Sequence, residues 1–531
     1  MIEFDYIVVG GGSSGCVVAA RLSENPNNRV LLIESGRRDD NRWIHIPATF
    51  FKVLEGGKDA QLYASEPEKH MNGRPNLVPQ GHVIGGGSSV NAMIYIRGAS
   101  DDYNTWAQLG NRNWSYEKVL PVFRALEDNQ GLSDEFHGTN GPLKVSDKAY
   151  GHRLCEAFVE AAQQAGLRYN RDFNGKAQEG VGFYQTTTYR GKRFSAAVAF
   201  LREAEKRKNL EIMTQTRVAR VVFDGKKASA VELESGTQIK ARKEIILCAG
   251  AIATPKLLQL SGVGNAVELK GHGIDVVADV PGVGENYQDH MEAPVQGESI
   301  HPISMLGQDK GLAAARHMAQ YMLTKTGLLT SNVVECGGFA DVSGAGQPDI
   351  QFHVLPALVG FADRVPEPGH GLSIGPCILR PKSRGTVKLR SANPKDPALF
   401  NANTFSDVSD LDTLVCGVQL SIKILEAPAL AKIIKRRVLP KLGLEKNHEA
   451  LSDYVRNTAK TVFHPSGTCK MGPATDKRSV VDEELRVRGV QGLRVADVSI
   501  MPTLVSGNTN APAMMIGERA ARFILNLEHA A

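Results

Sequence analysis

A glycine-rich stretch near the start of the chain restricts the fold more than any other feature of the sequence. Residues 6–9 form a short apolar, β-branched run that predicts a buried strand, and residues 17–22 have helical spacing. Between them, Gly10, Gly12 and Gly15 form the pattern G-x-G-x-x-G. A strand, a tight turn and a helix in this order predict a site for the pyrophosphate of a dinucleotide.

The chemistry of this turn explains its residue types. Glycine lets the backbone turn sharply and approach a phosphate closely, and the free N–H groups of the helix N-terminus, where Ser13 and Ser14 lie, favour an anion. Residues 29–33 predict the second strand, and Glu34 at its end is placed to accept hydrogen bonds from ribose hydroxyls. An acid at this position favours an unphosphorylated ribose, and therefore FAD or NAD rather than NADP.

Composition limits the partners. The chain has 531 residues, of which 42% are hydrophobic and 22% charged, so we expect two to four compact regions. The formal net charge of +5 is small for this length, and we expect the basic clusters to be solvated helix faces. The sequence therefore predicts no nucleic-acid partner and at most peripheral membrane association.

Cysteine and histidine usage argues against a metal centre. The seven cysteines are scattered, which is atypical of a disulfide framework or a cysteine metal site, and the fourteen histidines contain no pair at metal-ligand spacing with an acid beside it. We see no signal-peptide pattern and no apolar run of transmembrane length, so we expect a cytoplasmic protein without a metal.

Three later segments carry further patterns. A second glycine cluster, residues 80–93, is consistent with either a ligand-binding loop or an ordinary glycine loop. Residues 244–250 predict another buried parallel strand, followed by a helix in 253–264. His464 precedes a proline, which favours extended backbone and a fixed imidazole, as a general base requires.

These segments together resemble the glucose–methanol–choline (GMC) oxidoreductase family of FAD enzymes, and the similarity runs over residues 4–525. The resemblance implies a combined α/β and α+β fold: a Rossmann-type, glutathione-reductase-like FAD-binding domain with a parallel sheet, and a substrate domain built on an antiparallel sheet covered by helices. It implies the FAD-binding domain in residues 1–150, 196–296 and 460–531, and the substrate domain in 151–195 and 297–459.

The resemblance also implies how the cofactor is held. The second glycine loop would wrap the flavin, and the adenine, ribityl or phosphate and ring portions would be contacted from other segments. Several relatives carry a flavin-bonded histidine where this chain has Val90, which implies non-covalent FAD; Gln61 replaces a tryptophan common in relatives. The implied contacts beyond the first turn come from Gly81, Val83, Gly87, Ser88, Asn91, Val218, Asp497, Asn508, Thr509 and Asn510.

The implied activity is FAD-dependent dehydrogenation of a primary alcohol on a small polar substrate. His464 would take the hydroxyl proton, Asn508 would donate a hydrogen bond to the same oxygen, and FAD would accept the hydride. We expect an electron acceptor other than NAD(P), such as a quinone, a dye-like molecule or a protein carrier.

Within the family the chain looks most like the L-sorbose dehydrogenase and choline dehydrogenase subgroup. We favour a sugar or polyol over choline, because a quaternary ammonium group is typically held in an aromatic cage and only 6% of residues are aromatic. A choline dehydrogenase, an alcohol oxidase that uses dioxygen and a cyanohydrin lyase on the same scaffold remain alternatives.

Overall fold

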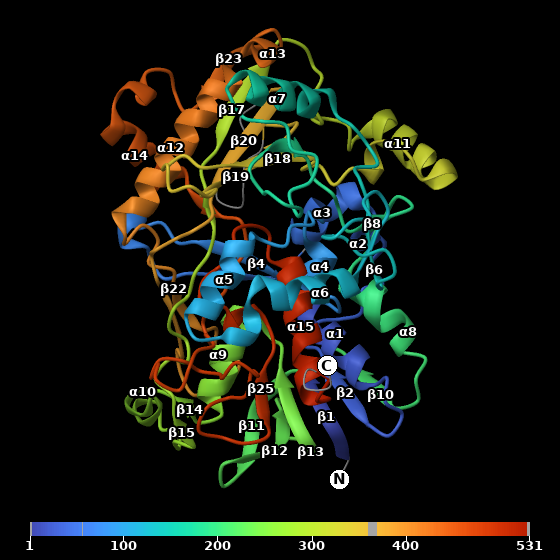
Figure 1. The fold of residues 1–531 in the computed structure, drawn as a ribbon, viewed down its shortest axis with the longest axis vertical. Helices are drawn as coiled ribbons and strands as arrows, with labels where there is room; N and C mark the ends of the chain where they lie inside the picture. The colour runs from blue at the N-terminus through green and yellow to red at the C-terminus, as the bar shows by residue number, and fades with distance from the viewer. Residues whose placement is uncertain (1–2, 56, 359–368, 528–531) are drawn as a thin grey trace.

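The computed structural model describes residues 3–55, 57–358 and 369–527, which form two stacked bodies, each built around one large β-sheet (Figure 1). The body in the lower half of Figure 1 contains the N-terminus and β1, and the body in the upper half contains β17 to β20. In the described part of the chain, no helix is both long and apolar enough to span a membrane.

The first sheet is parallel at its centre. β1 (Glu3–Val9) lies between β2 (Val30–Ile33) and β13 (Gln238–Leu247), and β10 (Leu210–Met213) pairs with β2. Helix α1 (Ser13–Leu22) connects β1 to β2. Almost every residue of β1 and β2 is buried, as is typical of a parallel sheet covered on both faces. The predicted strand–turn–helix–strand unit is thus confirmed.

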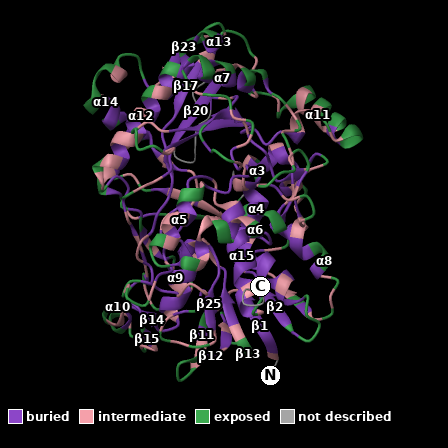
Figure 2. Ribbon diagram, viewed as in Figure 1, coloured by how far each residue is buried: buried purple, intermediate pink, exposed green. Residues whose placement is uncertain are grey.

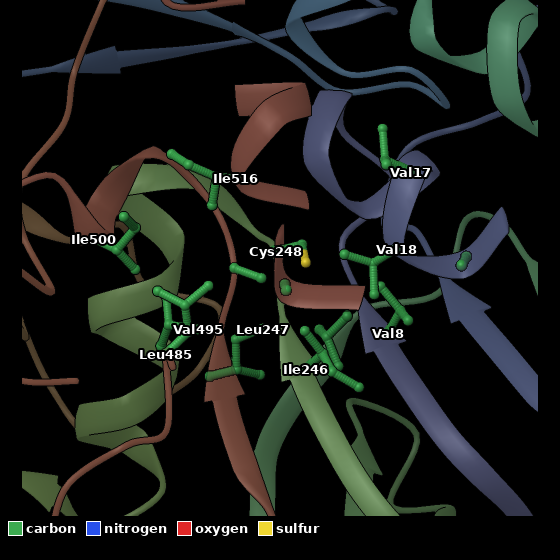
Figure 3. Packing of buried hydrophobic residues seen from close by; sticks show 14 of the residues in the cluster. Val8, Val17, Val18, Ile246, Leu247, Cys248, Leu485, Val495, Ile500 and Ile516 are labelled. Carbon is green, nitrogen blue, oxygen red and sulfur yellow. The ribbon is translucent and has the colours of Figure 1, made fainter. Parts of the chain in front are cut away.

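The long strand β13 joins distant parts of the chain. Its first half is antiparallel to β12 (Lys227–Leu233), which pairs with β11 (Val218–Asp224), and its second half is parallel to β25 (Leu493–Val495). The C-terminal helix α15 (Asn510–Ile524) then packs against α1. Figure 3 shows side chains of these strands and helices in one core, among them Val8, Val17, Ile246, Val495 and Ile516.

The second sheet is antiparallel throughout. Its main strand order is β23–β17–β20–β19–β18–β7; the short strand β16 pairs with β20, and the short strand β24 pairs with β16. Helices α7 (Arg153–Gln164) and α12 (Val408–Leu425) pack on one face. The strands are β7 (Gly180–Phe183), β16 (Met291–Glu292), β17 (Val295–Ser299), β18 (Cys336–Ala340), β19 (Ile350–Leu355), β20 (Gly371–Ile378), β23 (Ile434–Leu439) and β24 (Lys460–Thr461).

This architecture confirms the predicted fold class and refines two of its details. The antiparallel sheet already takes up β16 and β17, so it begins before the expected boundary at residue 297. Residues 385–390 alternate apolar and polar side chains, but the strand they contain, β21 (Thr386–Lys388), lies outside this sheet and pairs with β22 (Leu399–Asn401) in a separate two-stranded ribbon. Period-two alternation predicts a strand but does not say which neighbour it will pair with.

Burial follows the same division. Figure 2 shows buried residues along the strands of both sheets and exposed residues on outer helices such as α11 (Gly311–Thr324). Further elements of the described chain are α4 (Gly87–Val90), α5 (Ser100–Gln108), α6 (Tyr116–Leu126), α9 (Gly250–Leu260), α14 (His448–Thr458), β3 (Ala60–Ala64) and β4 (Leu77–Gly81).

Candidate active site

Two glycine-rich turns meet at the carboxyl end of β1. The backbone N–H of Gly85 donates to the carbonyl of Gly11 over 2.7 Å, and a Cβ on Gly86 would lie 2.6 Å from the Cα of Gly12. A Cβ on Gly15 would lie 1.9 Å from the carbonyl oxygen of the first glycine of the turn. The two loops are more than seventy residues apart in sequence. They can approach this closely because the positions in contact are glycines, which have no Cβ.

The conformation of the first turn is also specific to glycine. Gly10 has a φ of +104°, which an L side chain rarely adopts. The turn ends at Gly12, the N-cap of α1, which has extended φ and ψ and no side-chain cap. The first N–H groups of α1 are therefore not capped by any side chain of the N-cap residue.

Open space lies in front of these turns. A Cβ at Gly12 would meet no atom closer than 3.9 Å, and one at Gly87 would meet none within 4 Å. Helix α15 also begins without a side-chain cap at Thr509, and Ser13 donates to Asn510 over 2.9 Å, so the N-termini of α1 and α15 lie together. A cradle beside two uncapped helix N-termini fits the diphosphate of a dinucleotide.

Glu34 is bound to the turn at both carboxylate oxygens. One oxygen accepts from the N–H of Gly11 and the other from the N–H of Gly36, each over 2.7 Å. Burial raises the pKa of Glu34, against the effect of these two backbone hydrogen bonds. Glu34, the residue predicted to bind ribose hydroxyls, therefore lies at the end of β2, against the first glycine turn.

A buried arginine holds the second glycine loop, residues 85–91, by hydrogen bonds. Arg193 donates to the carbonyl of Ser88 over 3.1 Å and to the side-chain oxygen of Asn91 over 2.7 Å. Val83 is fully buried beneath the loop, and Gly81 lies so close to the loop that a Cβ there would come within 2.3 Å of backbone. These contacts fix the loop that the sequence analysis assigned to the cofactor.

Arg193 itself had no signal in the sequence. It is 1% exposed, one of its terminal nitrogens has no hydrogen-bond partner, and among the described residues no carboxylate forms an ion pair with it. Burial lowers its pKa to about 9. A buried guanidinium without a carboxylate beside the cradle suits an anionic or electron-rich cofactor.

The C-terminal segment closes the other side of the cradle. Asp497 accepts from the N–H of Gly250 over 2.8 Å and from the hydroxyl of Thr254 over 2.6 Å, which connects β25 to the start of α9. The Ser14 hydroxyl donates to the carbonyl of Ala496, immediately before this acid. Val218 is half-buried at the first position of β11, and the backbone N–H of Thr216 just before it donates to the carbonyl of Glu34 over 3.0 Å.

His464 is positioned by its backbone. Its N–H donates to the carboxylate of Asp289 over 2.9 Å, and the preceding residue, Phe463, has a φ of +70°. Asp289 also accepts from the Thr461 hydroxyl and from the N–H of His290. Burial raises the pKa of Asp289 to about 6, although these donors favour its charged form. Strained backbone held by a buried acid is typical of a functional position.

The hydrogen bonds of two histidines determine where the lone pairs lie. His290 Nε2 is 3.1 Å from the carbonyl oxygen of Leu379, so this nitrogen must carry the hydrogen. The Nδ1 of neutral His290 is then an acceptor, and it lies 2.9 Å from the Nδ1 of His464. His464 therefore donates from Nδ1 and keeps a lone pair on Nε2, which is the arrangement of a general base.

Asn508 faces that lone pair. Its amide nitrogen is 3.5 Å from His464 Nε2, and its side-chain oxygen accepts from Gln351 Nε2 over 3.0 Å. Gln351 thus holds the amide with its N–H₂ group toward His464. The structure brings together the two residues that the sequence analysis named for catalysis, from segments that follow β24 and β25.

The pKa values of His464 and His290 keep both rings in the neutral form that a proton acceptor requires. Burial lowers the pKa of His464 well below its usual range, and the nearby His290 and His353 lower it further. Burial likewise lowers the pKa of His290 to about 3. Both rings are therefore neutral at pH 7, and His464 is ready to accept a proton.

A separate group of one histidine and two aspartates lies outside this site. Asp134, His137 and Asp172 are close enough to share an ion. However, His137 Nδ1 is 3.1 Å from Glu127 and its Nε2 is 3.0 Å from Asp172. Burial alone would lower the pKa of His137, but these hydrogen bonds raise it to about 9. An imidazolium bound to acids on both sides has no lone pair for a metal.

Comparison with known proteins agrees with this geometry. Residues 4–292 and 381–517 match the N- and C-terminal models of the GMC oxidoreductase family. The chain is 43% identical to "Alcohol dehydrogenase [acceptor]" of Pseudomonas putida, over 98% of this chain and 96% of that protein. It is 40% identical to "Oxygen-dependent choline dehydrogenase" of Brucella suis biovar 1, over 99% and 96%.

A solved structure shows the same fold. Pyridoxine 4-oxidase from "Mesorbium loti" superposes with a TM-score of 0.89 at 30% identity, over 99% of each chain. The cradle between two glycine loops and the neutral histidine both lie within the residues that the two family models match. The protein is therefore a member of the GMC oxidoreductase family, an FAD-dependent enzyme that oxidises CH–OH groups.

Proposed function

We propose that the protein oxidises a primary alcohol of a small polar substrate, with a sugar or polyol preferred, to the aldehyde. The observation that supports this most directly is the pair formed by His464 and Asn508, because it presents one lone pair and one N–H donor about 3.5 Å apart. An alcohol oxygen beside the pair, within hydrogen-bond distance of both nitrogens, can give its proton to His464 Nε2 while it accepts from Asn508.

The proton step uses the tautomer described above. As the hydroxyl proton moves to His464 Nε2, the ring becomes an imidazolium whose Nδ1–H still donates to His290. The developing alkoxide is then stabilised by the adjacent positive charge and by the Asn508 amide. When FAD is bound, it supplies the acceptor for the hydride that leaves the alcohol carbon.

We assign FAD binding to the residues around the cradle. The N-termini of α1 and α15 would hold the diphosphate, Glu34 the ribose, and Asp497 the ribityl or phosphate portion. The second loop, with Gly87, Ser88 and Asn91, would border the flavin, and Val218 the adenine. Val90 in place of a histidine supports non-covalent binding, so acid precipitation should release all of the flavin into the supernatant.

The electron acceptor is proposed to be neither NAD nor NADP. The P. putida relative is named for an unspecified acceptor and the B. suis relative for dioxygen, so both routes need testing. Anaerobic flavin bleaching by sugars, polyols, choline and simple alcohols tests the proposed oxidation. Peroxide release compared with dye reduction separates an oxidase from a dehydrogenase. Absence of bleaching with every alcohol would leave the lyase alternative.

A further inference from the structure

Strand β19 presents a polar face to the catalytic pair. Ile350 and Phe352 belong to the core under α7 and α12, so the alternate residues Gln351 and His353 lie on the opposite face of the strand. Gln351 reaches Asn508 from this face. His353, two residues further along, therefore extends the site away from Asn508 on the same surface.

Two buried polar atoms on this face have no partner. Gln351 is 0% exposed and His353 is 7% exposed, and the structure gives neither Gln351 Oε1 nor His353 Nε2 a hydrogen bond. An unsatisfied buried polar atom is costly, and a bound ligand that supplies the missing hydrogen bond removes that cost. Both atoms are suited to hydroxyl groups of a ligand held by Asn508.

A charged pair continues this surface. Glu292 is 4% exposed, and its carboxylate is 2.9 Å from Lys460 Nζ and 3.2 Å from His353 Nδ1. Glu292 and Lys460 are also register partners in β16 and β24. Burial alone would raise the pKa of Glu292, but Lys460 and His353 hold it to about 2. The carboxylate is thus ionised, and Lys460 compensates its charge.

We propose that this surface, Gln351, His353, Glu292 and Lys460, binds an uncharged, hydroxyl-bearing part of the substrate, and that Lys460 prevents Glu292 from attracting a cationic alcohol. The proposal rests on the alcohol oxidation proposed above and adds the charge class of the substrate. A quaternary ammonium group beside Glu292 would also lie beside the lysine and would have to be desolvated without a net opposite charge.

The test compares choline with 3,3-dimethylbutan-1-ol, in which carbon replaces the charged nitrogen at nearly the same volume. For the wild-type holoenzyme we expect kcat/KM to be at least about 10-fold higher for the uncharged alcohol. In Lys460→Met the ratio should shift toward choline by about 10-fold or more, whereas Lys460→Arg, which keeps the charge, should retain the wild-type ratio.

The hydroxyl contacts need a separate measurement. Wild-type enzyme should use butane-1,2,4-triol with a lower KM than butan-1-ol, and His353→Leu should reduce that difference about 10-fold or more while butan-1-ol changes less. If Lys460→Met does not retain flavin, inhibition of the wild type decides: tetramethylammonium should inhibit at least about 10-fold more weakly than tert-butanol.

The outcomes are distinguishable. Bleaching by alcohols with choline preferred, an unchanged ratio in a folded Lys460→Met, or no advantage of the triol would overturn this inference alone. No bleaching by any alcohol would overturn the proposed function and this inference with it.

Discussion

The Nδ1 atoms of His290 and His464 lie 2.9 Å apart, and only one of them can carry a hydrogen while both rings are neutral. The carbonyl of Leu379 assigns that hydrogen to His464, because it takes the Nε2–H of His290. A residue outside the catalytic segment thereby sets the tautomer of the base. The reactive lone pair of His464 is the consequence of this arrangement and of Asn508 on the opposite side.

Replacing His464 should abolish most of the turnover without loss of cofactor. His464→Ala removes the proton acceptor, so we expect kcat to fall by roughly 10²–10⁴-fold with normal flavin content. His448→Ala, at a side chain that is 64% exposed, is the matched control and should behave as wild type. Near-normal turnover of a flavin-loaded His464→Ala would remove this residue from the mechanism.

Replacing Asn508 should have a smaller effect. Asn508→Ala removes one hydrogen bond to the reacting oxygen, and we expect kcat to fall by about 10–100-fold. Because the loss concerns the charged transition state, single-turnover flavin reduction should slow by the same factor. If flavin reduction keeps its wild-type rate, Asn508 only packs against the cofactor.

The pH profile tests His464 as the base, and variants of His290 test whether that residue positions it. Because burial lowers the pKa of His464 well below the usual histidine value of about 6.5, kcat/KM should stay flat around neutral pH and through that value, and should fall only at clearly lower pH, where the base becomes protonated. His290→Phe removes the acceptor for His464 Nδ1–H, so kcat should decrease by about 10-fold or more. His290→Gln keeps an acceptor oxygen and should restore part of the activity. Equal activity of both variants across the pH range would contradict a positioning role.

Glu34 should determine FAD affinity. Glu34→Gln leaves only one oxygen for two backbone N–H groups, and we expect the dissociation constant of FAD to rise by about 10-fold or more in reconstitution experiments. Glu66→Gln removes an exposed acid that pairs with Arg390 at the surface, and it should leave FAD affinity unchanged. Unaltered affinity in Glu34→Gln would place the ribose elsewhere.

The spacing of residues along the sequence was enough to predict part of the fold. The order of strand, glycine turn, helix and acid in residues 6–34 depends on short-range sterics: the turn at Gly10 has positive φ, and residues 6–9 of β1 are apolar and buried. Family resemblance added His464, Asn508 and the antiparallel sheet. Nothing local marked β16 or β24, which are two residues each: β16 exists as the partner of β20 and β24, and β24 as the partner of β16.

The remaining site residues depended on three-dimensional packing. Gln351 and His353 are ordinary alternate residues of a strand. Gln351 reaches Asn508, and His353 lies on the same face, only because of how β19 is placed in the sheet beside β20. Arg193, His290 and the Glu292–Lys460 pair acquire their chemistry from burial against distant segments. A sequence motif encodes backbone shape within a few residues, whereas a tautomer, a shifted pKa or a compensated charge depends on neighbours that only the folded chain brings into contact.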